Sequence, residues 1–258
     1  MQRTFKLTVA YDGTDYVGWQ IQPGRPTIQG LIERSVARRV GQRVGVVGSG
    51  RTDSGVHAIA QAASCVVPHW AATAESFATA VNVDLPDSIL VTEAVDAPEG
   101  FHAIRDSISK RYRYQIQNGG NRNPLEHRYW YRLRKPVDTD AMTEASRRIV
   151  GRHDFASFQA AGAQRKTTER NVSACDVIPL PDGPWGEPRV AIEVEADGFL
   201  YNMVRNIVGT LIEVGRGKRP AAWVDQVLAA KNRDHAGPTA PPHGLFLLSV
   251  RYAPFDAG

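Results

Sequence analysis

VGVVGSGRTDSGVHAIAQAASCVV spans residues 44–67 and holds the clearest local pattern in the chain. Its two ends, residues 44–48 and 57–67, are rich in valine and small apolar residues, which is typical of strands. The segment between them contains glycines, which accept the backbone conformations of tight turns. The stretch therefore predicts two consecutive strands joined by a glycine-rich turn.

The residues around this stretch complete a β-α-β-β-α-β order. Residues 5–11 (FKLTVAY) alternate in polarity as a strand does. Thr27 is a suitable N-cap for a helix that Gly41 can end. The apolar residues of that helix recur at helical spacing: Ile28, Leu31, Ile32, Val36 and Val40. A second helix is predicted over residues 73–82 and another strand over 88–95.

The second half of the chain is predicted to repeat this order. The expected elements are a strand at 110–117, a helix from Asp138/Thr139 to Gly151, strands at 171–178 and 189–196, helices at 200–214 and 221–230, and a strand at 245–252. Two copies of one plan predict a mixed α/β (α+β) fold with two related antiparallel sheets, each with helices on one face. We divide the chain into domains 1–105 and 106–258, so that the Asp53 turn falls in the first domain.

The glycine-rich turn, GRTDSGVH at residues 50–57, is the first candidate for chemistry. Asp53 lies between glycines, where the backbone is open to a ligand. In an extended segment Arg51 points to the same side, and an arginine beside a carboxylate keeps it ionised and oriented. These are the requirements for a nucleophile or a base. The alternative is a turn without chemistry, because Asp-Ser-Gly favours turns.

The second candidate is the strand segment Lys110-Arg111-Tyr112-Arg113-Tyr114. Alternation puts the lysine and the tyrosines on one face and the arginines on the other. Aromatic rings beside cations suit an everted base and its phosphates. Residues 101–135 carry an excess of seven positive charges, against +4 for the whole chain. The alternative is a solvated face on which the charges pair across strands.

The third candidate is Arg205, in the apolar helical segment FLYNMVRNIVGTLIEVG at residues 199–215. Apolar residues surround it on nearly every helical face, so the helix should be buried. A buried guanidinium needs an anionic partner, and Asp53 is a natural suggestion. The alternative is that Arg205 reaches a helix edge and binds a phosphate or a carbonyl.

Composition limits the class of protein. The chain has 258 residues, 42% hydrophobic and 22% charged, which is ordinary for a globular protein. A pI near 9.2 permits a polyanionic partner without demanding one. Cys65 and Cys175 lie in strand-like runs and are expected to be buried thiols in a reducing compartment. The sequence has neither zinc-ligand spacing, a secretion signal nor a membrane-length apolar stretch, so we expect a cytoplasmic protein.

Together these segments resemble the tRNA pseudouridine synthase A family. The resemblance runs almost from end to end and is carried by seven blocks in the family's order: YDGTDYVGWQIQ (11–22), TIQGLIE (27–33), GRTDSGVHA (50–58), SKRYRYQI (109–116), HDFASFQAAG (153–162), DGFLYNMVRNIVGTLIEVGRGK (197–218) and AGPTAPPHGLFL (236–247). One such motif would be weak evidence, but chance agreement of seven is very improbable.

The resemblance implies a function and a set of roles. It implies isomerisation of uridine to pseudouridine at positions 38, 39 and 40 of tRNA, by a homodimer with a central basic cleft and without cofactor or metal. Asp53 is implied as the catalytic aspartate, Arg205 as its partner and Tyr112 as the active-site tyrosine. The other implied substrate-binding residues are Arg51, Lys110, Arg111 and Arg113.

The chain departs from the family at two points. Ile104 stands where many relatives have an arginine, and Arg105 follows it. Ser54 replaces an alanine that is common after the catalytic aspartate, a change from which we expect little effect.

Two rival functions and three chemical routes stay open at this stage. The fold could serve a non-catalytic RNA-binding module, or Asp12 in Asp12-Gly13-Thr14 could serve a Mg²⁺-dependent phosphotransferase. Asp53 could attack C1′, add to the base, or remove the C2′ proton. Tyr112 is expected to stack on the base and to assist loss of the C5 proton.

Overall fold

The computed structural model of the chain describes residues 2–160, 162 and 167–255, so that Ala161 of the HDFASFQAAG block lies outside the described residues. The chain divides into two compact units. The first runs to Ile108 and resumes at Phe246, and the second is Ser109–Leu245. The predicted division at 105/106 left the final strand in the second half. That strand belongs with the first unit because Phe246 and Leu247 pair with residues of the strand that follows the Asp53 turn.

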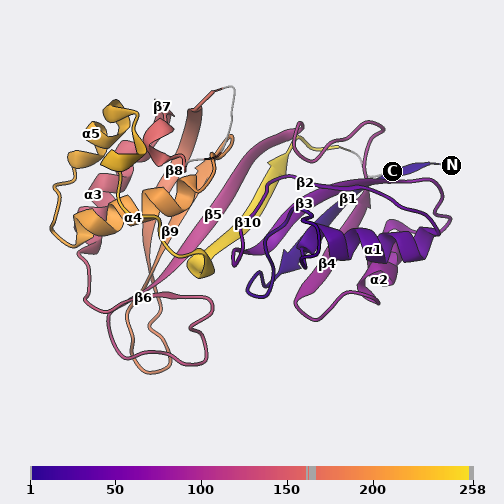
Figure 1. The fold of residues 1–258 in the computed structure, drawn as a ribbon, viewed down its shortest axis with the longest axis horizontal. Helices are drawn as coiled ribbons and strands as arrows, with labels where there is room; N and C mark the ends of the chain where they lie inside the picture. The colour runs from indigo at the N-terminus through magenta and orange to yellow at the C-terminus, as the bar shows by residue number, and fades with distance from the viewer. Residues whose placement is uncertain (1, 161, 163–166, 256–258) are drawn as a thin grey trace. The chain divides into compact units, whose positions relative to one another are not determined.

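The first unit follows the predicted order (Figure 1). Its elements are β1 (Arg3–Tyr11), α1 (Ile28–Val40), β2 (Val46–Gly48), β3 (His57–Val67), α2 (Ala74–Asn82), β4 (Ile89–Asp96) and the returning β10 (Leu245–Tyr252). The caps of α1 are confirmed: the Thr27 side chain accepts a hydrogen bond from the Gly30 N–H, and Gly41 ends the helix with φ 75°. Thr73 caps α2 in the same way, through the Ser76 N–H.

The core of the first unit lies between its strands and its two helices. Alternate residues of β1, among them Phe5, Leu7 and Val9, are fully buried. Phe5 stacks on Phe77 of α2 with ring centroids 4.6 Å apart. The Ser35 hydroxyl of α1 donates to a backbone carbonyl of α2, which ties the two helices together.

The strands of the first unit are mostly antiparallel. β1 lies between β4 and β3, and β2 pairs with β3 on the same pattern. β10 pairs with β3 in parallel, so the prediction of purely antiparallel sheets is wrong at this pair. The parallel pairing follows from the topology, because β10 returns from the second unit rather than from a hairpin.

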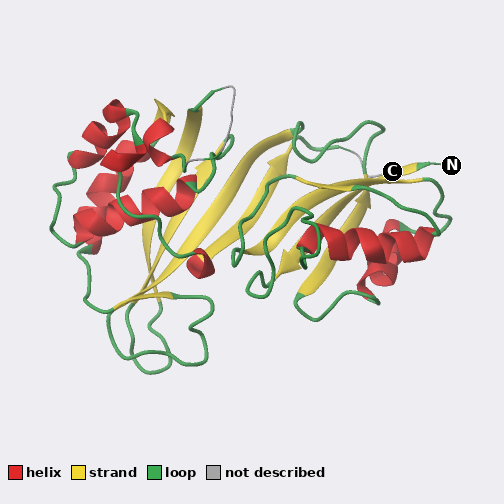
Figure 2. Ribbon diagram, viewed as in Figure 1, coloured by secondary structure: helices red, strands yellow, loops and turns green. Residues whose placement is uncertain are grey.

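The second unit contains more elements than the repeat predicted (Figure 2). They are β5 (Ser107–Asn118), β6 (Tyr131–Leu133), α3 (Thr139–Ser146), β7 (Gly151–Asp154), β8 (Glu169–Leu180), β9 (Arg189–Ala196), α4 (Met203–Gly215) and α5 (Trp223–Ala230), with single 3₁₀ turns at Arg147–Ile149, Ala156–Phe158, Arg233–His235 and Pro242–Gly244. The short strands β6 and β7 were not predicted.

The helix expected to end at Gly151 stops earlier. α3 ends at Ser146, and a 3₁₀ turn follows it. Gly151 adopts φ 116° and begins β7, so its left-handed conformation bends the chain into a strand instead of capping a helix.

The strands of the second unit run in the order β5-β9-β8-β7, all antiparallel, and β6 adds to β5 in parallel. Almost every residue of α4 is buried, as predicted. α3 packs closely on it, since a Cβ at Gly215 would lie 2.7 Å from the Met142 Cγ.

Cys65 and Cys175 are buried free thiols, as expected, and burial raises the pKa of each. In the part of the chain that the structure describes, no helix has the length and apolarity needed to cross a membrane.

Candidate functional site

Asp53 lies in the loop that joins β2 to β3, as the sequence predicted. The loop turns at Gly55, whose φ is 76°, and the Val56 N–H donates to the Asp53 carbonyl at 3.1 Å. Asp53 is half-buried, whereas Arg51 is exposed. The carboxylate is thus held on a tight turn at an accessible position.

Two buried side chains from neighbouring strands fix the base of this loop. The Tyr11 hydroxyl hydrogen-bonds the Thr52 hydroxyl at 2.8 Å. Gln61, fully buried on β3, binds Gly50 twice: its Nε2 donates to the Gly50 carbonyl at 2.7 Å, and its Oε1 accepts from the Gly50 N–H at 3.3 Å. Burial raises the pKa of Tyr11 to about 12, against the opposing effect of its bonds to Thr52 and Gln61. The tyrosine is therefore a neutral anchor at ordinary pH.

A second loop, residues 12–19, clamps the Asp53 loop from another side. The Trp19 N–H donates to the Thr52 carbonyl at 3.0 Å, and the Ser54 hydroxyl donates to the Tyr16 carbonyl at 2.9 Å. The two backbones approach so closely that only glycine fits at Gly13, where a Cβ would lie 2.0 Å from the Val56 carbonyl oxygen.

The 12–19 loop also has to turn sharply. Gly18 adopts φ 102°, and a Cβ there would lie 2.5 Å from the Thr52 carbonyl oxygen. The motif DGTDYVGW thus shapes the support of the Asp53 loop, which preorganises the carboxylate. In the sequence analysis this motif contributed to the family resemblance and to the rival phosphotransferase hypothesis, and its support of the Asp53 loop was not predicted. The Ser54 hydroxyl makes one of the clamping bonds, and the expectation that this departure has little effect stays a prediction.

His57 and Asp12 serve this support and not a separate centre. The His57 ring is buried and stacks on Phe246 with centroids 4.6 Å apart. Its Nδ1 lies 3.1 Å from the Gly13 nitrogen and 3.1 Å from Asp12 Oδ1, which ties the ring to the turn that begins at Asp12. Asp12 accepts bonds from the Thr14 N–H and hydroxyl, as the first residue of a turn does.

The other predicted site residues lie in the second unit. Tyr112 is buried on β5, and its ring meets Phe199 edge-on with centroids 5.0 Å apart. Lys110 lies two residues before it and is half-buried. The predicted alternation is confirmed, because Tyr112 and Tyr114 are both buried while the residues on either side of Tyr112 are half-exposed.

Arg111 and Arg113 on the opposite face are paired across strands. The Arg111 Nε lies 2.6 Å from Glu193 Oε2, and its Nη atoms reach Glu195 at 3.5 Å and Asp176 at 3.7 Å. Arg113 binds the other oxygen of Glu193 at 2.5 Å. Partial burial acts to lower the pKa of Arg111, but the carboxylates outweigh it and the net shift is upward. For these two arginines the geometry favours the alternative of a cross-strand-paired face.

Arg205 lies in the first turn of α4 and is half-buried, less than its apolar surroundings predicted. Its Nε donates to the Ala240 carbonyl at 2.7 Å and one Nη to Asn202 Oδ1 at 2.9 Å. The carbonyl contact that the alternative interpretation predicted is therefore present. Whether it also pairs with Asp53 stays a prediction.

The segment around Ala240 is strapped onto α4. The Ala240 N–H donates to the Arg205 carbonyl at 3.1 Å, and Thr239 Oγ1 donates to Asn206 Oδ1 at 2.6 Å. A Cβ at Gly209 would lie 1.6 Å from the Pro238 carbonyl oxygen, so the strap requires a glycine there. This strap fixes the Arg205 guanidinium. The sequence analysis did not predict this strap. The features that could have indicated it are a glycine inside the helix, Gly209, and the proline-rich segment 236–244.

The structure describes the surroundings of Ile104 and Arg105, where the sequence departs from many relatives. Ile104 is exposed, and Arg105 is tied to Asp106 at 2.8 Å and to the Gly100 carbonyl at 2.6 Å. The Asp106 bond raises the pKa of Arg105. Arg105 therefore closes a local turn. Within residues 2–160, 162 and 167–255, no three His, Cys, Asp or Glu side chains are grouped to hold a metal ion.

The chain is similar to known tRNA-modifying proteins over nearly its whole length. The sequence model of the tRNA pseudouridine synthase family matches residues 7–105 and 145–253, which include Asp53 and Arg205 but not Tyr112. A tRNA pseudouridine synthase A of Myxococcus xanthus is 44% identical over 247 residues, 96% of this chain and 91% of the relative. Proteins of the same name from Syntrophotalea carbinolica and Limosilactobacillus fermentum are 43% and 41% identical, and each alignment covers at least 95% of both chains.

Proposed function

The chain belongs to the tRNA pseudouridine synthase family, and from this we propose that it isomerises uridine to pseudouridine in tRNA, at positions 38, 39 and 40 of the anticodon arm. The reaction breaks the bond from N1 to C1′, turns the uracil, joins C5 to C1′ and releases the C5 proton. It involves no redox change and no external group, so the protein's own side chains suffice. The uridine must first leave its stack, which costs roughly a few kcal/mol.

Asp53 is the proposed catalytic carboxylate. The observation that carries this assignment is the loop that holds it, fixed by Tyr11, Gln61 and the 12–19 loop in a conformation that leaves Asp53 half-exposed. A turn without chemistry does not need three independent anchors. Such preorganisation reduces the cost of placing a nucleophile against the reacting carbon.

The remaining roles complete this proposal. Arg205 keeps Asp53 ionised, and its own orientation is set by the Ala240 carbonyl. Tyr112 stacks on the everted base and assists departure of the C5 proton, and Lys110 on the same face attracts the phosphates. Arg51, exposed on the Asp53 loop, is a further proposed phosphate contact.

Arg111 and Arg113 take a different part in the proposal. Since both are paired with carboxylates, Arg111 with Glu193, Glu195 and Asp176 and Arg113 with Glu193, they contribute less net charge to RNA binding than the sequence suggested. Their ion pairs stiffen β5 against β9, which steadies the strand carrying Tyr112. A homodimer, a cytoplasmic location and a division of the site residues between the N-terminal and C-terminal parts of the chain belong to the same proposal.

The test compares Asp53→Asn with Asp87→Asn, which alters an exposed aspartate away from the loop. Tritium release from C5-labelled uridine in tRNA measures turnover, and filter binding measures tRNA affinity. We expect Asp53→Asn to lose a factor on the order of 10⁴ or more in rate, as enzymes that lose a nucleophile do, while tRNA affinity stays near that of the unaltered protein. Asp87→Asn should resemble the unaltered protein in both.

Near-normal pseudouridine formation by Asp53→Asn would refute the catalytic assignment. A protein that binds tRNA but never releases tritium, even unaltered, would instead be the non-catalytic RNA-binding module. Mapping of pseudouridines in tRNA from cells lacking the protein tests the three proposed positions.

A further inference from the structure

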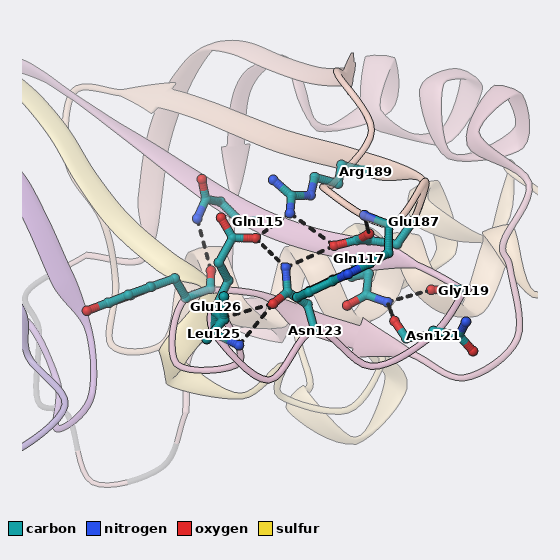
Figure 3. Close-up of polar contacts among 11 residues, drawn as sticks. Gln115, Gln117, Gly119, Asn121, Asn123, Leu125, Glu126, Glu187 and Arg189 are labelled. Atoms are coloured by element: carbon teal, nitrogen blue, oxygen red, sulfur yellow. Dashed lines mark hydrogen bonds and ion pairs between the residues drawn. The ribbon is translucent and has the colours of Figure 1, made fainter.

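Two loops of the second unit, residues 119–130 and 181–188, are joined by a buried polar frame (Figure 3). Its centre is the Glu187 carboxylate, and the residue is only 2% exposed. Glu187 accepts bonds from Asn123 Nδ2 at 2.9 Å, from Arg189 at 3.2 Å and from the Trp185 N–H at 2.9 Å. A carboxylate buried in this way is tolerated only with such partners, so the two loops hold each other in one arrangement.

Further bonds fix the conformation of the first loop. Asn123 Oδ1 accepts from the backbone N–H groups of Leu125 and Glu126, at 3.0 and 3.2 Å. Arg189 forms an ion pair with Glu126, and its guanidinium lies 4.5 Å from the centre of the Trp130 ring. The loop is therefore held by its polar side chains although it has little regular structure.

The glycines of both loops permit their close approach. A Cβ at Gly183 would lie 2.0 Å from Glu187 Oε1. Gly120 adopts φ 71°, and a Cβ there would lie 3.2 Å from the Glu187 Cα.

The frame supports a pocket of about 270 Å³. Its lining residues include Arg122, His127, Trp130, Tyr131, Arg132 and Arg134. The volume is slightly below the roughly 300–1,000 Å³ typical of sites for whole small molecules, and suits one phosphate with part of its nucleoside.

The pocket is positively charged. Its lining contains three arginines against one carboxylate, Glu126. Glu126 shares Arg189 with the buried Glu187, and the arginines still leave an excess of positive charge. Among the described residues, Arg122, Arg132 and Arg134 take part in none of the ion pairs. Arg132 donates through an Nη to the Gly120 carbonyl at 2.7 Å, which orients its guanidinium and leaves its charge uncompensated.

The arginines of the basic stretch 101–135 differ in whether their charge is compensated by a carboxylate. Arg105, Arg111 and Arg113 of that stretch are bound to carboxylates. The three arginines without ion pairs instead gather around one pocket beside aromatic rings. Forked guanidinium groups and an aromatic wall are the combination that binds a nucleic-acid phosphate with its neighbouring base.

We propose that this pocket binds a phosphodiester of the tRNA substrate, with the adjoining nucleoside against Trp130, and that it is an RNA contact separate from the Asp53 loop. The inference rests on the proposed function for its substrate. The pocket contributes affinity and register through the RNA backbone and takes no part in the chemical step.

The pocket variant, Arg122→Gln/Arg134→Gln, removes two exposed arginines of the pocket. The control variant, Arg43→Gln/Arg147→Gln, removes two exposed arginines elsewhere. Affinity for an unmodified tRNA transcript is measured at several KCl concentrations. The pocket variant should bind on the order of tenfold more weakly, and the slope of log Kd against log salt should fall by about one to two. Its melting temperature should stay unchanged, and the control variant should bind as the unaltered protein does.

An unchanged Kd and salt slope in the pocket variant, or an equal change in the control, overturns the inference. So does a tryptophan-fluorescence titration in which the pocket variant loses binding of inorganic phosphate but keeps full tRNA affinity, since the site would then serve free phosphate. Failure of the proposed function has a different signature, because the unaltered protein would release no tritium whatever the pocket variant does.

Discussion

Tyr11→Phe isolates the anchor under the Asp53 loop and gives a pH-dependent result. The substitution removes one oxygen atom and the 2.8 Å bond to the Thr52 hydroxyl. A lost buried hydrogen bond costs about 1–3 kcal/mol when its partner is left unsatisfied, so the variant should be less stable by that amount at pH 7. Tyr11 is buried and its hydroxyl bonds Thr52 in the Asp53 loop, so we expect the effect on activity to act through the loop.

The direction in which the pKa of Tyr11 is shifted determines how the stability of the protein depends on pH. The pKa is raised from its ordinary value of 10.0 to about 12, so the folded state holds the phenolic proton more tightly than the unfolded state. The resulting stability is fully present below pH 10 and is lost as the pH rises from 10 to 12. At pH 11 the unaltered protein should have lost on the order of 1 kcal/mol through this group. Phenylalanine does not titrate, so the stability difference between the two proteins should shrink by that amount.

Urea unfolding at pH 7, 9, 10 and 11 measures the difference in unfolding free energy between the unaltered protein and Tyr11→Phe. All other titrating groups are the same in both proteins, so their contributions cancel in this difference. A difference that stays constant from pH 7 to pH 11 would refute the account of Tyr11 as a buried neutral anchor.

The single-turnover rate of Tyr11→Phe at neutral pH should fall on the order of tenfold, because the Asp53 loop loses one support. Tyr16→Phe is the matched control: its hydroxyl bonds Ser88, while its contact with the Asp53 loop uses the backbone and survives.

Further substitutions test the other supports. Gly13→Ala places a Cβ 2.0 Å from the Val56 carbonyl oxygen and should destabilise the protein by about 1–3 kcal/mol in urea unfolding, with a loss of turnover; an unaltered rate would show that the 12–19 loop does not position Asp53. Arg205→Ala loses its bond to the Ala240 carbonyl and should cost about 1–3 kcal/mol, with a fall in tritium release that Arg205→Lys does not restore, since an ammonium lacks the forked geometry. Glu193→Gln should leave the paired arginines of β5 with more net charge and steepen the salt dependence of tRNA binding; an unchanged slope would mean that this face lies away from the RNA.

Local patterns in the sequence predicted the longer elements well, because their periodicity and caps are short-range properties. Thr27 and Gly41 bound α1 as expected, and β9 and β10 have the predicted limits. The strands β6 and β7, with three and four residues, are too short to display a period of two. The parallel return of β10 onto β3 depends on the path of the intervening chain, which no local pattern encodes.

The site divides in the same way. Alternation correctly placed Tyr112 and the arginines of β5 on opposite faces. It could not identify Glu193 as the shared partner of those arginines, since the register of β5 against β9 joins residues far apart in the sequence. The anchors Tyr11 and Gln61 were missed for the same reason, because each acts through a tertiary contact with the Asp53 loop.

The basic stretch shows why charge counted along a chain differs from charge available in space. Its excess of seven positive charges is a property of the sequence. In the folded protein, an arginine or lysine attracts RNA less when a neighbouring carboxylate compensates its charge. Cross-strand pairing compensates Arg111 and Arg113, whereas the pocket arginines Arg122, Arg132 and Arg134 have no such acidic partners among the described residues. The affinity should therefore reside mainly in the loops and the mechanical stiffness in the strand, even though both carry the same residue type.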